Sequence, residues 1–192
     1  MKNKWKWVYN PFEFLAGWNA FGIGIVILCI TTIVGYFGYT VFYALEIKSV
    51  PNVTWNMAFS LQFSGLAVTV VIMYVTALLF AKGVRFQDLL GTVTLAKYPL
   101  LLMALFSLPF GKKIASIDIN KFITMEFTIS DILPLMILGI ISIILLTWEV
   151  VLLFNAFRVS TNLKGVKCAG LFVAALLITE IVTVVLVFLF MR

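Results

Sequence analysis

Long runs of apolar residues without any charge dominate the first half of the chain. No charged side chain occurs at positions 14–45, and none occurs at positions 49–81. A helix needs about 20 apolar residues to cross a hydrocarbon layer about 30 Å thick. Either run is long enough, so the pattern predicts membrane-spanning helices rather than a water-soluble core.

The whole pattern predicts an all-α fold, a polytopic membrane protein built as a bundle of five transmembrane helices. Lys97 and Pro99 interrupt the third apolar run, but at about 1.5 Å per residue it still reaches about 28 Å. Gly83 marks the helix stop before it. The expected spans are residues 17–45, 57–81, 92–110, 132–157 and 168–190.

We divide the chain into two parts, an interfacial N-terminal segment (residues 1–16) and a five-helix membrane domain (residues 17–192). The N-terminal segment is polar and aromatic, and the apolar run after it is too long for the core of a signal peptide. We therefore expect the first span to be retained as an anchor.

Basic residues near the ends of the spans set the expected orientation, because cytoplasmic loops are enriched in lysine and arginine. A cytoplasmic N-terminus places eight basic residues inside: Lys2, Lys4, Lys6, Lys82, Arg85, Arg158, Lys164 and Lys167. It leaves five outside: Lys48, Lys112, Lys113, Lys121 and Arg192. We expect the N-terminus in the cytoplasm and the C-terminus outside.

The amino-acid composition limits the kinds of reaction and ligand that the chain can support. The chain is 63% hydrophobic and 11% charged, and it contains no histidine. Without histidine it lacks the usual general base near neutral pH and the commonest metal ligand. Cys29 and Cys168 have neither partner spacing nor polar surroundings, so they are interpreted as small apolar residues. We expect no enzyme, no metal and no cofactor. The net charge is +6, and the basic residues lie at the ends of the expected helices. This placement indicates that they set the orientation in the membrane and contact anionic lipid headgroups, rather than bind nucleic acid.

The N-terminal segment mixes aromatic rings with lysines before the first span. Such rings settle at headgroup level, and lysines bind anionic lipid there. We interpret the segment as an interfacial anchor, and the alternative is a peptide that binds a partner. The anchor residues are Trp5, Lys6, Trp7 and Tyr9. Arg158, Lys164 and Lys167 form a corresponding basic turn on the cytoplasmic side between the last two spans.

The only sizeable polar stretch covers positions 112–131. Apolar and polar residues alternate at positions 122–129, a period of two that predicts an extended segment lying on the bundle. Thr128 and Asp131 then predict a capping box that opens the fourth helix.

Three ionisable residues fall inside the expected spans: Lys97, Glu149 and Glu180. A charge left alone in hydrocarbon costs several kcal/mol, so each should face the bundle interior and find a partner. Lys97 and Glu149 lie at similar heights in the cytoplasmic half, and we predict that they pair. Glu180 lies near mid-span and is expected to be protonated or to bond to a hydroxyl such as that of a threonine.

Helical periodicity predicts which residues share the inward faces with these charges. On the fourth helix they are Gly139, Ser142, Glu149 and Ala156; on the fifth they are Ala169, Leu176, Glu180 and Thr183. Small residues let helices approach closely, and the first helix carries such a series at Ala16, Ala20 and Gly24.

The polar cluster has two interpretations. In the structural one, Lys97, Glu149 and Glu180 fix the register of the helices. In the functional one they line a path for a proton, an ion or a small solute, beside a helix broken at Pro99. We favour the structural interpretation because one lysine and two acids can satisfy one another.

The order of several short motifs among the five spans is distinctive. Asn10-Pro11 precedes the first span, Tyr98-Pro99 lies in the third, and Trp148 lies in the fourth, which ends on Phe157-Arg158. A basic turn at positions 163–167 leads into the last span. Across nearly the whole chain this order resembles the Yip family of Ypt/Rab-GTPase-interacting membrane proteins.

The resemblance implies a five-helix bundle with a cytoplasmic N-terminus, and a compact prokaryotic member in a bacterial cytoplasmic (inner) membrane. Because the segment before the first span is shorter than in the eukaryotic relatives, we do not expect a GTPase partner. The leading hypothesis is a non-enzymatic Yip-type protein that packs against lipids, a second copy of itself or another membrane protein, in membrane organisation or a trafficking-like role. The alternative is a small permease or channel that uses the Lys97, Glu149 and Glu180 cluster.

Overall fold

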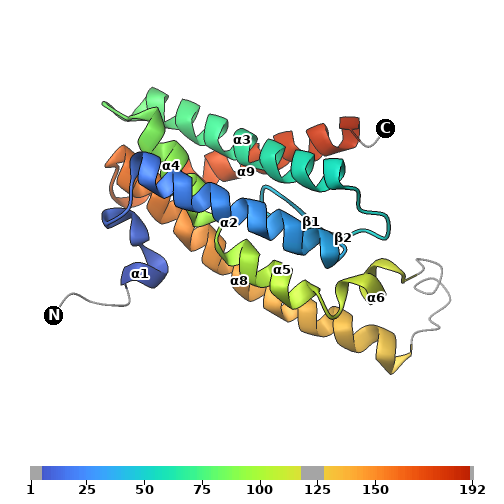
Figure 1. Cartoon of the computed structure of the whole chain (residues 1–192). Coiled ribbons are helices and arrows are strands. Elements are labelled where there is room, and N and C mark those ends of the chain that lie inside the picture. Colours follow the sequence, from blue (N-terminus) through green and yellow to red (C-terminus); the bar gives the residue numbers. More distant parts are fainter. Residues whose placement is uncertain (1–5, 118–127, 191–192) are drawn as a thin grey trace.

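The computed structural model describes residues 6–117 and 128–190. Within these ranges five helical segments are long and apolar enough to cross a membrane, and they form one bundle (Figure 1). They are α2 (Gly17–Phe37), α3 (Trp55–Phe80), α4 (Phe86–Ala96) continued by α5 (Pro99–Ser107), α8 (Ile129–Thr161) and α9 (Gly165–Phe190). Shorter helices are α1 (Lys6–Tyr9), η1 (Pro11–Glu13) and α6 (Gly111–Ala115). The expectation of five apolar helices is confirmed.

The expected first span is wrong in its last third. Helix α2 ends at Phe37, and an antiparallel hairpin of β1 (Thr40–Tyr43) and β2 (Glu46–Ser49) follows. The prediction failed because the absence of charge indicates an apolar environment but does not distinguish helix from strand. The β-branched and aromatic side chains of β1 favour a strand, so the all-α expectation misses this element.

The hairpin folds back into the bundle, and we call residues 40–49 the re-entrant hairpin. All four residues of β1 are buried. Val41 and Tyr43 pack with residues of α3 such as Leu61, whereas Phe42 packs with Leu100 of α5. In Figure 1 the hairpin lies between α3 and α2. Its strands therefore occupy space that helices alone would leave open.

Glycines allow the closest approaches in this core. A Cβ at Gly65 of α3 would clash with the backbone nitrogen of Ala44 at the hairpin tip. A Cβ at Gly24 of α2 would lie 2.7 Å from the backbone nitrogen of Leu95 on α4. Ala20 is also fully buried, although Ala16 is exposed. The small-residue series of the first helix is thus buried at Ala20 and Gly24, where Gly24 lets α2 approach α4 closely, but not at Ala16, which precedes the helix.

The third span is two helices. It begins at Phe86, earlier than expected, and α4 ends at Ala96. Lys97 and Tyr98 form the junction, and Pro99 opens α5, a position where its missing N–H costs nothing. The break predicted from Lys97 and Pro99 is therefore present.

The ends of the other helices differ from the expected ones by a few residues. Both α8 and α9 begin three residues early. The capping box of Thr128 and Asp131 is confirmed at the start of α8, and Gly83 adopts the left-handed φ of +75° expected of a helix stop. The alternation at positions 122–129 falls mostly outside the described residues.

The inward faces of the last two helices are corrected. On α8 the buried line contains Leu138, Leu145, Glu149, Leu152 and Ala156, whereas Gly139 and Ser142 are only half-buried. Ten positions separate Gly139 from Glu149, which at 3.6 residues per turn puts them about 80° apart. On α9 the buried line contains Cys168, Phe172, Ala175, Thr179 and Thr183. Ala169 is exposed there, and Leu176 and Glu180 are half-buried.

Candidate functional site

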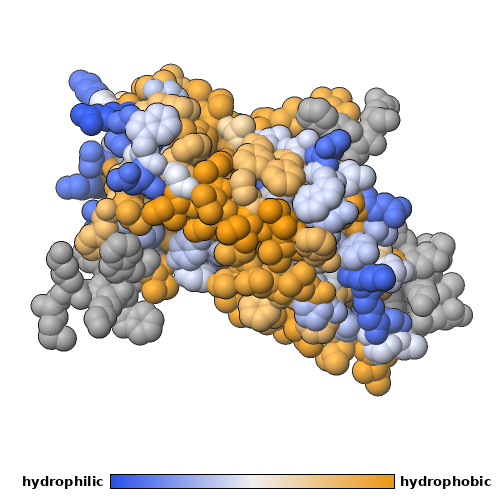
Figure 2. All heavy atoms as spheres, in the orientation of Figure 1, coloured by the Kyte–Doolittle hydropathy of each residue, from blue (hydrophilic) through white to orange (hydrophobic). Residues whose placement is uncertain are grey.

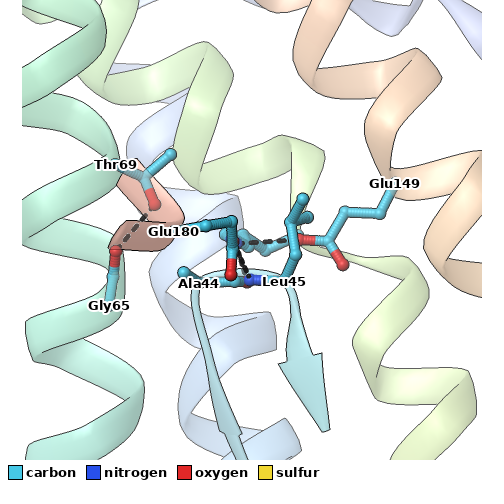
Figure 3. Close-up of polar contacts among 7 residues, drawn as sticks. Ala44, Leu45, Gly65, Thr69, Glu149 and Glu180 are labelled. Atoms are coloured by element: carbon cyan, nitrogen blue, oxygen red, sulfur yellow. Dashed lines mark hydrogen bonds and ion pairs between the residues drawn. The ribbon is translucent and has the colours of Figure 1, made fainter. Parts of the chain in front are cut away.

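The tip of the re-entrant hairpin bonds to two of the three ionisable residues of the expected spans, Lys97 and Glu180, and Glu149 bonds to Lys97 beside it (Figure 3). The Lys97 ammonium donates one hydrogen bond to the Ala44 carbonyl oxygen (2.5 Å) and another to Glu149 Oε1 (2.8 Å). The Leu45 backbone N–H donates to Glu180 Oε1 at 3.1 Å. We call Lys97, Glu149 and Glu180, together with these tip atoms, the polar clasp.

The clasp holds a single peptide group at both of its ends. The Ala44 carbonyl and the Leu45 N–H belong to the same peptide unit, at the turn between β1 and β2. Tyr43 pairs with Glu46 across the ladder, so this turn peptide points beyond the hairpin's own hydrogen bonds. A buried backbone N–H or carbonyl without a partner is costly. A cation on the carbonyl and a carboxylate on the N–H also match the direction of the peptide dipole.

Three separate elements supply the clasp side chains. Lys97 lies at the junction of α4 and α5, Glu149 on the buried face of α8, and Glu180 on α9. In Figure 3, Glu149 and Glu180 approach the hairpin tip from opposite sides. Gly65 of α3 lies beside the tip, and its carbonyl accepts a hydrogen bond from the Thr69 hydroxyl (2.7 Å). The clasp thus ties the hairpin to the helices around it.

Burial differs between the members of the clasp. Lys97 is 1% exposed and Glu149 is 0% exposed, whereas Glu180 is half-buried. The structure brings Lys97 and Glu149 together, as their similar heights predicted. Glu180 bonds to a backbone N–H rather than to the threonine hydroxyl that the sequence suggested. Within the described part of the chain, Glu149 Oε2 and the Thr183 hydroxyl are buried without a hydrogen-bond partner.

A second polar locus fixes the N-terminal segment. The Val8 carbonyl oxygen accepts hydrogen bonds from Tyr98 Oη (2.7 Å) and Trp148 Nε1 (2.9 Å). The Tyr9 carbonyl oxygen accepts one from Asn155 Nδ2 (2.8 Å). The Tyr98 and Trp148 rings meet edge to face at 5.1 Å. We call this group the N-terminal dock; its side chains come from the α4–α5 junction and from α8.

The dock continues into the core. Asn10, Pro11 and Phe12 are buried, and Phe12 belongs to the main hydrophobic cluster of the bundle. Sequence reasoning singled out Asn10, Pro11, Tyr98 and Trp148 but not that they meet. It missed Asn155 altogether, although an asparagine inside an apolar helix is a signal that could have been read.

The remaining expected residues lie apart from both loci. The Ser142 hydroxyl bonds to the Gly139 carbonyl of its own helix, so Ser142 does not join the clasp. Pro99 is buried at the start of α5. Tyr9 is exposed, while Trp5 and the side chains of Lys6 and Trp7 fall outside the described residues. The basic turn is solvent-accessible at all three positions, Arg158, Lys164 and Lys167.

The arrangement of the clasp limits its chemistry. Lys97 uses its ammonium on Glu149 and on the hairpin, and Glu180 accepts a backbone N–H. In residues 6–117 and 128–190, no group of three or more cysteine, aspartate or glutamate side chains is placed to hold a metal ion. The hydrogen bonds of the clasp therefore tie the hairpin to the α4–α5 junction, to α8 and to α9.

Comparison of the chain with protein-family models, with curated proteins and with solved structures gave no match.

Proposed function

We propose that the protein is a non-enzymatic integral membrane protein that acts through packing with lipids or partner membrane proteins. Five apolar helices support insertion into a bilayer. In Figure 2, hydrophilic side chains gather at the two ends of the molecule and apolar ones cover the middle. Such a band is the surface that a hydrocarbon layer requires.

The observation that carries this proposal is that Lys97, Glu149 and Glu180 bond to the re-entrant hairpin or to one another. Non-helical backbone at membrane depth is tolerated only where protein groups satisfy it. Lys97 and Glu180 do so at the Ala44–Leu45 peptide, and Glu149 compensates the Lys97 charge. Intramembrane charges usually indicate a transport path, but here the hairpin already accounts for them.

The N-terminal dock supports a Yip-type protein. The motifs behind that resemblance are Asn10-Pro11, Tyr98-Pro99 and Trp148, and Tyr98 and Trp148 both donate to Val8, two residues before Asn10. Tyr98 and Trp148, which lie 90 and 140 positions after Val8 in the sequence, thus contact the same backbone carbonyl. On this proposal the chain is a compact prokaryotic member in a bacterial cytoplasmic membrane, with the N-terminus inside and the C-terminus outside.

A permease or channel is the competing function. Glu180 is half-buried and Glu149 Oε2 has no partner among the described residues, which are the features in its favour. A conduit also needs water on both sides of the clasp. Buried positions near it provide the test: Val93 on α4 and Thr183 on α9, which are 0% and 3% exposed.

Single cysteines probed with a membrane-impermeant maleimide separate these functions. Cys29 and Cys168 are first replaced by alanine, and one cysteine is then introduced at Val93 or Thr183. We expect neither to be labelled in intact cells or in inverted vesicles. Labelling of either from one side would contradict a sealed clasp and favour a conduit.

Matched controls in the same experiment test the orientation. Lys48 and Lys164 are both exposed and lie at opposite ends of the bundle. We expect Lys48→Cys to react only from outside and Lys164→Cys only from inside. The reverse pattern would overturn the proposed orientation without affecting the conclusion about the clasp.

Packing against a partner is tested on the exposed face of α8. Ile140, Ile143 and Ile144 are 57%, 68% and 62% exposed, so a photoreactive residue at Ile143 faces whatever surrounds the bundle. A crosslink to protein in native membranes supports a second copy or another membrane protein, which the mass identifies. Crosslinks to lipid alone would restrict the proposal to lipid packing.

A further inference from the structure

A cavity of about 250 Å³ lies at one end of the bundle, and no residue of the clasp or of the dock lines it. It forms where α2 begins, α3 gives way to α4, and α8 ends. Its lining includes the side chains of Arg85, Asp88, Thr92 and Ser160, together with Asn162. Because the ends of membrane-crossing helices meet there, the cavity lies at the expected boundary between hydrocarbon and water.

The cavity brings two opposite charges together without pairing them. Within the described part of the chain, neither the Arg85 guanidinium nor the Asp88 carboxylate forms an ion pair, and neither side chain makes a hydrogen bond there. Arg85 is exposed and Asp88 is half-buried. The Asp88 carboxylate lies beside Gly17, where an added Cβ would be 3.3 Å from Asp88 Oδ1. Two unpaired opposite charges suit a ligand that itself carries both signs.

Hydroxyl groups complete the polar wall. Thr92 Oγ1 lies 3.0 Å from Ser160 Oγ, which joins α4 to α8 across the cavity. The Thr92 hydroxyl also bonds to the Asp88 carbonyl oxygen (2.8 Å). An oxygen of this pair has lone pairs left to accept from an ammonium group. The wall therefore offers an arginine for an anion and several oxygens for a hydrogen-bonding cation.

We propose that this cavity binds the headgroup of a phospholipid that carries a primary ammonium, with the phosphate at Arg85 and the ammonium at Asp88. Arginine recognises phosphate through two parallel hydrogen bonds, and a carboxylate accepts charge-assisted hydrogen bonds from an ammonium. The cavity is smaller than those of drug-sized ligands, about 300–1,000 Å³, which suits a headgroup whose acyl chains remain outside.

The charges also discriminate between lipid classes. The glycerol of an anionic headgroup such as phosphatidylglycerol carries no positive charge, so it offers Asp88 only neutral hydroxyl donors and no charge-assisted hydrogen bond. A choline headgroup keeps the positive charge but has no N–H to donate to Asp88 or Ser160. This proposal does not depend on the clasp, because none of Lys97, Glu149 and Glu180 lines the cavity.

Native mass spectrometry of the detergent-purified full chain tests this proposal. The protein is mixed with equal amounts of phosphatidylethanolamine, phosphatidylcholine and phosphatidylglycerol, and the retained lipid is counted. We expect phosphatidylethanolamine to be retained about tenfold more than either of the others, the factor expected for one charge-assisted hydrogen bond. Equal retention of the three lipids, or a preference for phosphatidylglycerol, would overturn the proposal.

Variants assign the two charges separately. Arg85→Gln should lower retention of all three lipids, whereas Asp88→Asn should abolish the preference for phosphatidylethanolamine over phosphatidylcholine. Lys82→Gln is the matched control, because Lys82 is exposed nearby but does not line the cavity. An equal loss in Lys82→Gln would show that general surface charge is responsible and would overturn the site.

Soluble glycerophosphoethanolamine distinguishes a lipid from a free headgroup. We expect it to displace the bound lipid only weakly, because it lacks the acyl chains. Displacement at equal concentration would mean that the cavity takes a soluble phosphoamine, and the lipid assignment would be overturned. The comparison of lipids on the unmodified protein decides the question even if a variant fails to fold.

Discussion

The Lys97 ammonium lies 2.8 Å from Glu149 Oε1 and donates at the same time to the Ala44 carbonyl. One side chain thus links α8 to the re-entrant hairpin. Removing one member of a buried pair leaves the other charge without compensation, at a cost of about 3–5 kcal/mol. We expect Lys97→Met to lower the free energy of unfolding by this amount, seen as a lower melting temperature in detergent.

A second change separates the charge from the hydrogen bond to the hairpin. Lys97→Met combined with Glu149→Leu removes both charges, so the double variant should be more stable than Lys97→Met alone. It should remain below the unmodified protein by about 1–3 kcal/mol, because the Ala44 carbonyl stays buried without its donor. Lys82→Met, at an exposed position, should melt like the unmodified protein. A Lys97→Met protein as stable as this control would contradict the clasp.

Glu180 should act as a hydrogen-bond acceptor rather than as a charge. Its Oε1 accepts the Leu45 N–H at 3.1 Å, and a glutamine side chain offers an equivalent carbonyl oxygen. We expect Glu180→Gln to keep the melting temperature and the slow hydrogen exchange of the Leu45 amide. Glu180→Leu should lose both, with a destabilisation of about 1–3 kcal/mol. Equal exchange in the two variants would show that the Leu45 amide does not depend on Glu180.

The hairpin position depends on the lack of a side chain at Gly65. A Cβ there would clash with the backbone of Tyr43 and Ala44. Backbone atoms cannot move aside as the end of a flexible side chain can. We expect Gly65→Ala to destabilise the protein by about 1–3 kcal/mol, measured by thermal unfolding. Gly139→Ala on α8 is the matched control, because a Cβ there meets nothing within 4 Å. Alanine is the better helix former, so the control should melt at the same or a higher temperature.

The sequence was sufficient for the parts of the fold that follow from hydropathy. Five apolar runs predicted five helices, and comparing depths along two spans predicted that Lys97 and Glu149 meet. It was insufficient for the re-entrant hairpin, because residues 40–45 are as apolar as the helix before them. The partner of Glu180 could not be predicted either, since it is the backbone N–H of Leu45, a group that every residue except proline carries.

The contacts of the N-terminal dock also could not be predicted from the sequence. Its motifs were visible in the sequence, but their acceptors are the backbone carbonyls of Val8 and Tyr9. Side-chain identity at these two positions therefore carried no signal. Asn155 was detectable in principle, because an amide inside an apolar helix requires a partner.

The dock should control how firmly the N-terminal segment is held. Tyr98 and Trp148 both donate to the Val8 carbonyl, and Tyr98→Phe with Trp148→Phe removes both donors while keeping aromatic rings in place. Each hydrogen bond contributes about 0.5–1.5 kcal/mol. We expect faster hydrogen exchange at positions 8–12 in the double variant, with exchange in α3 unchanged. Trp18→Phe is the control, because Trp18 is 62% exposed and donates no hydrogen bond to the segment in the described part of the chain. If the double variant exchanged as slowly as the control, burial of Phe12 alone would hold the segment and the two donors would be dispensable.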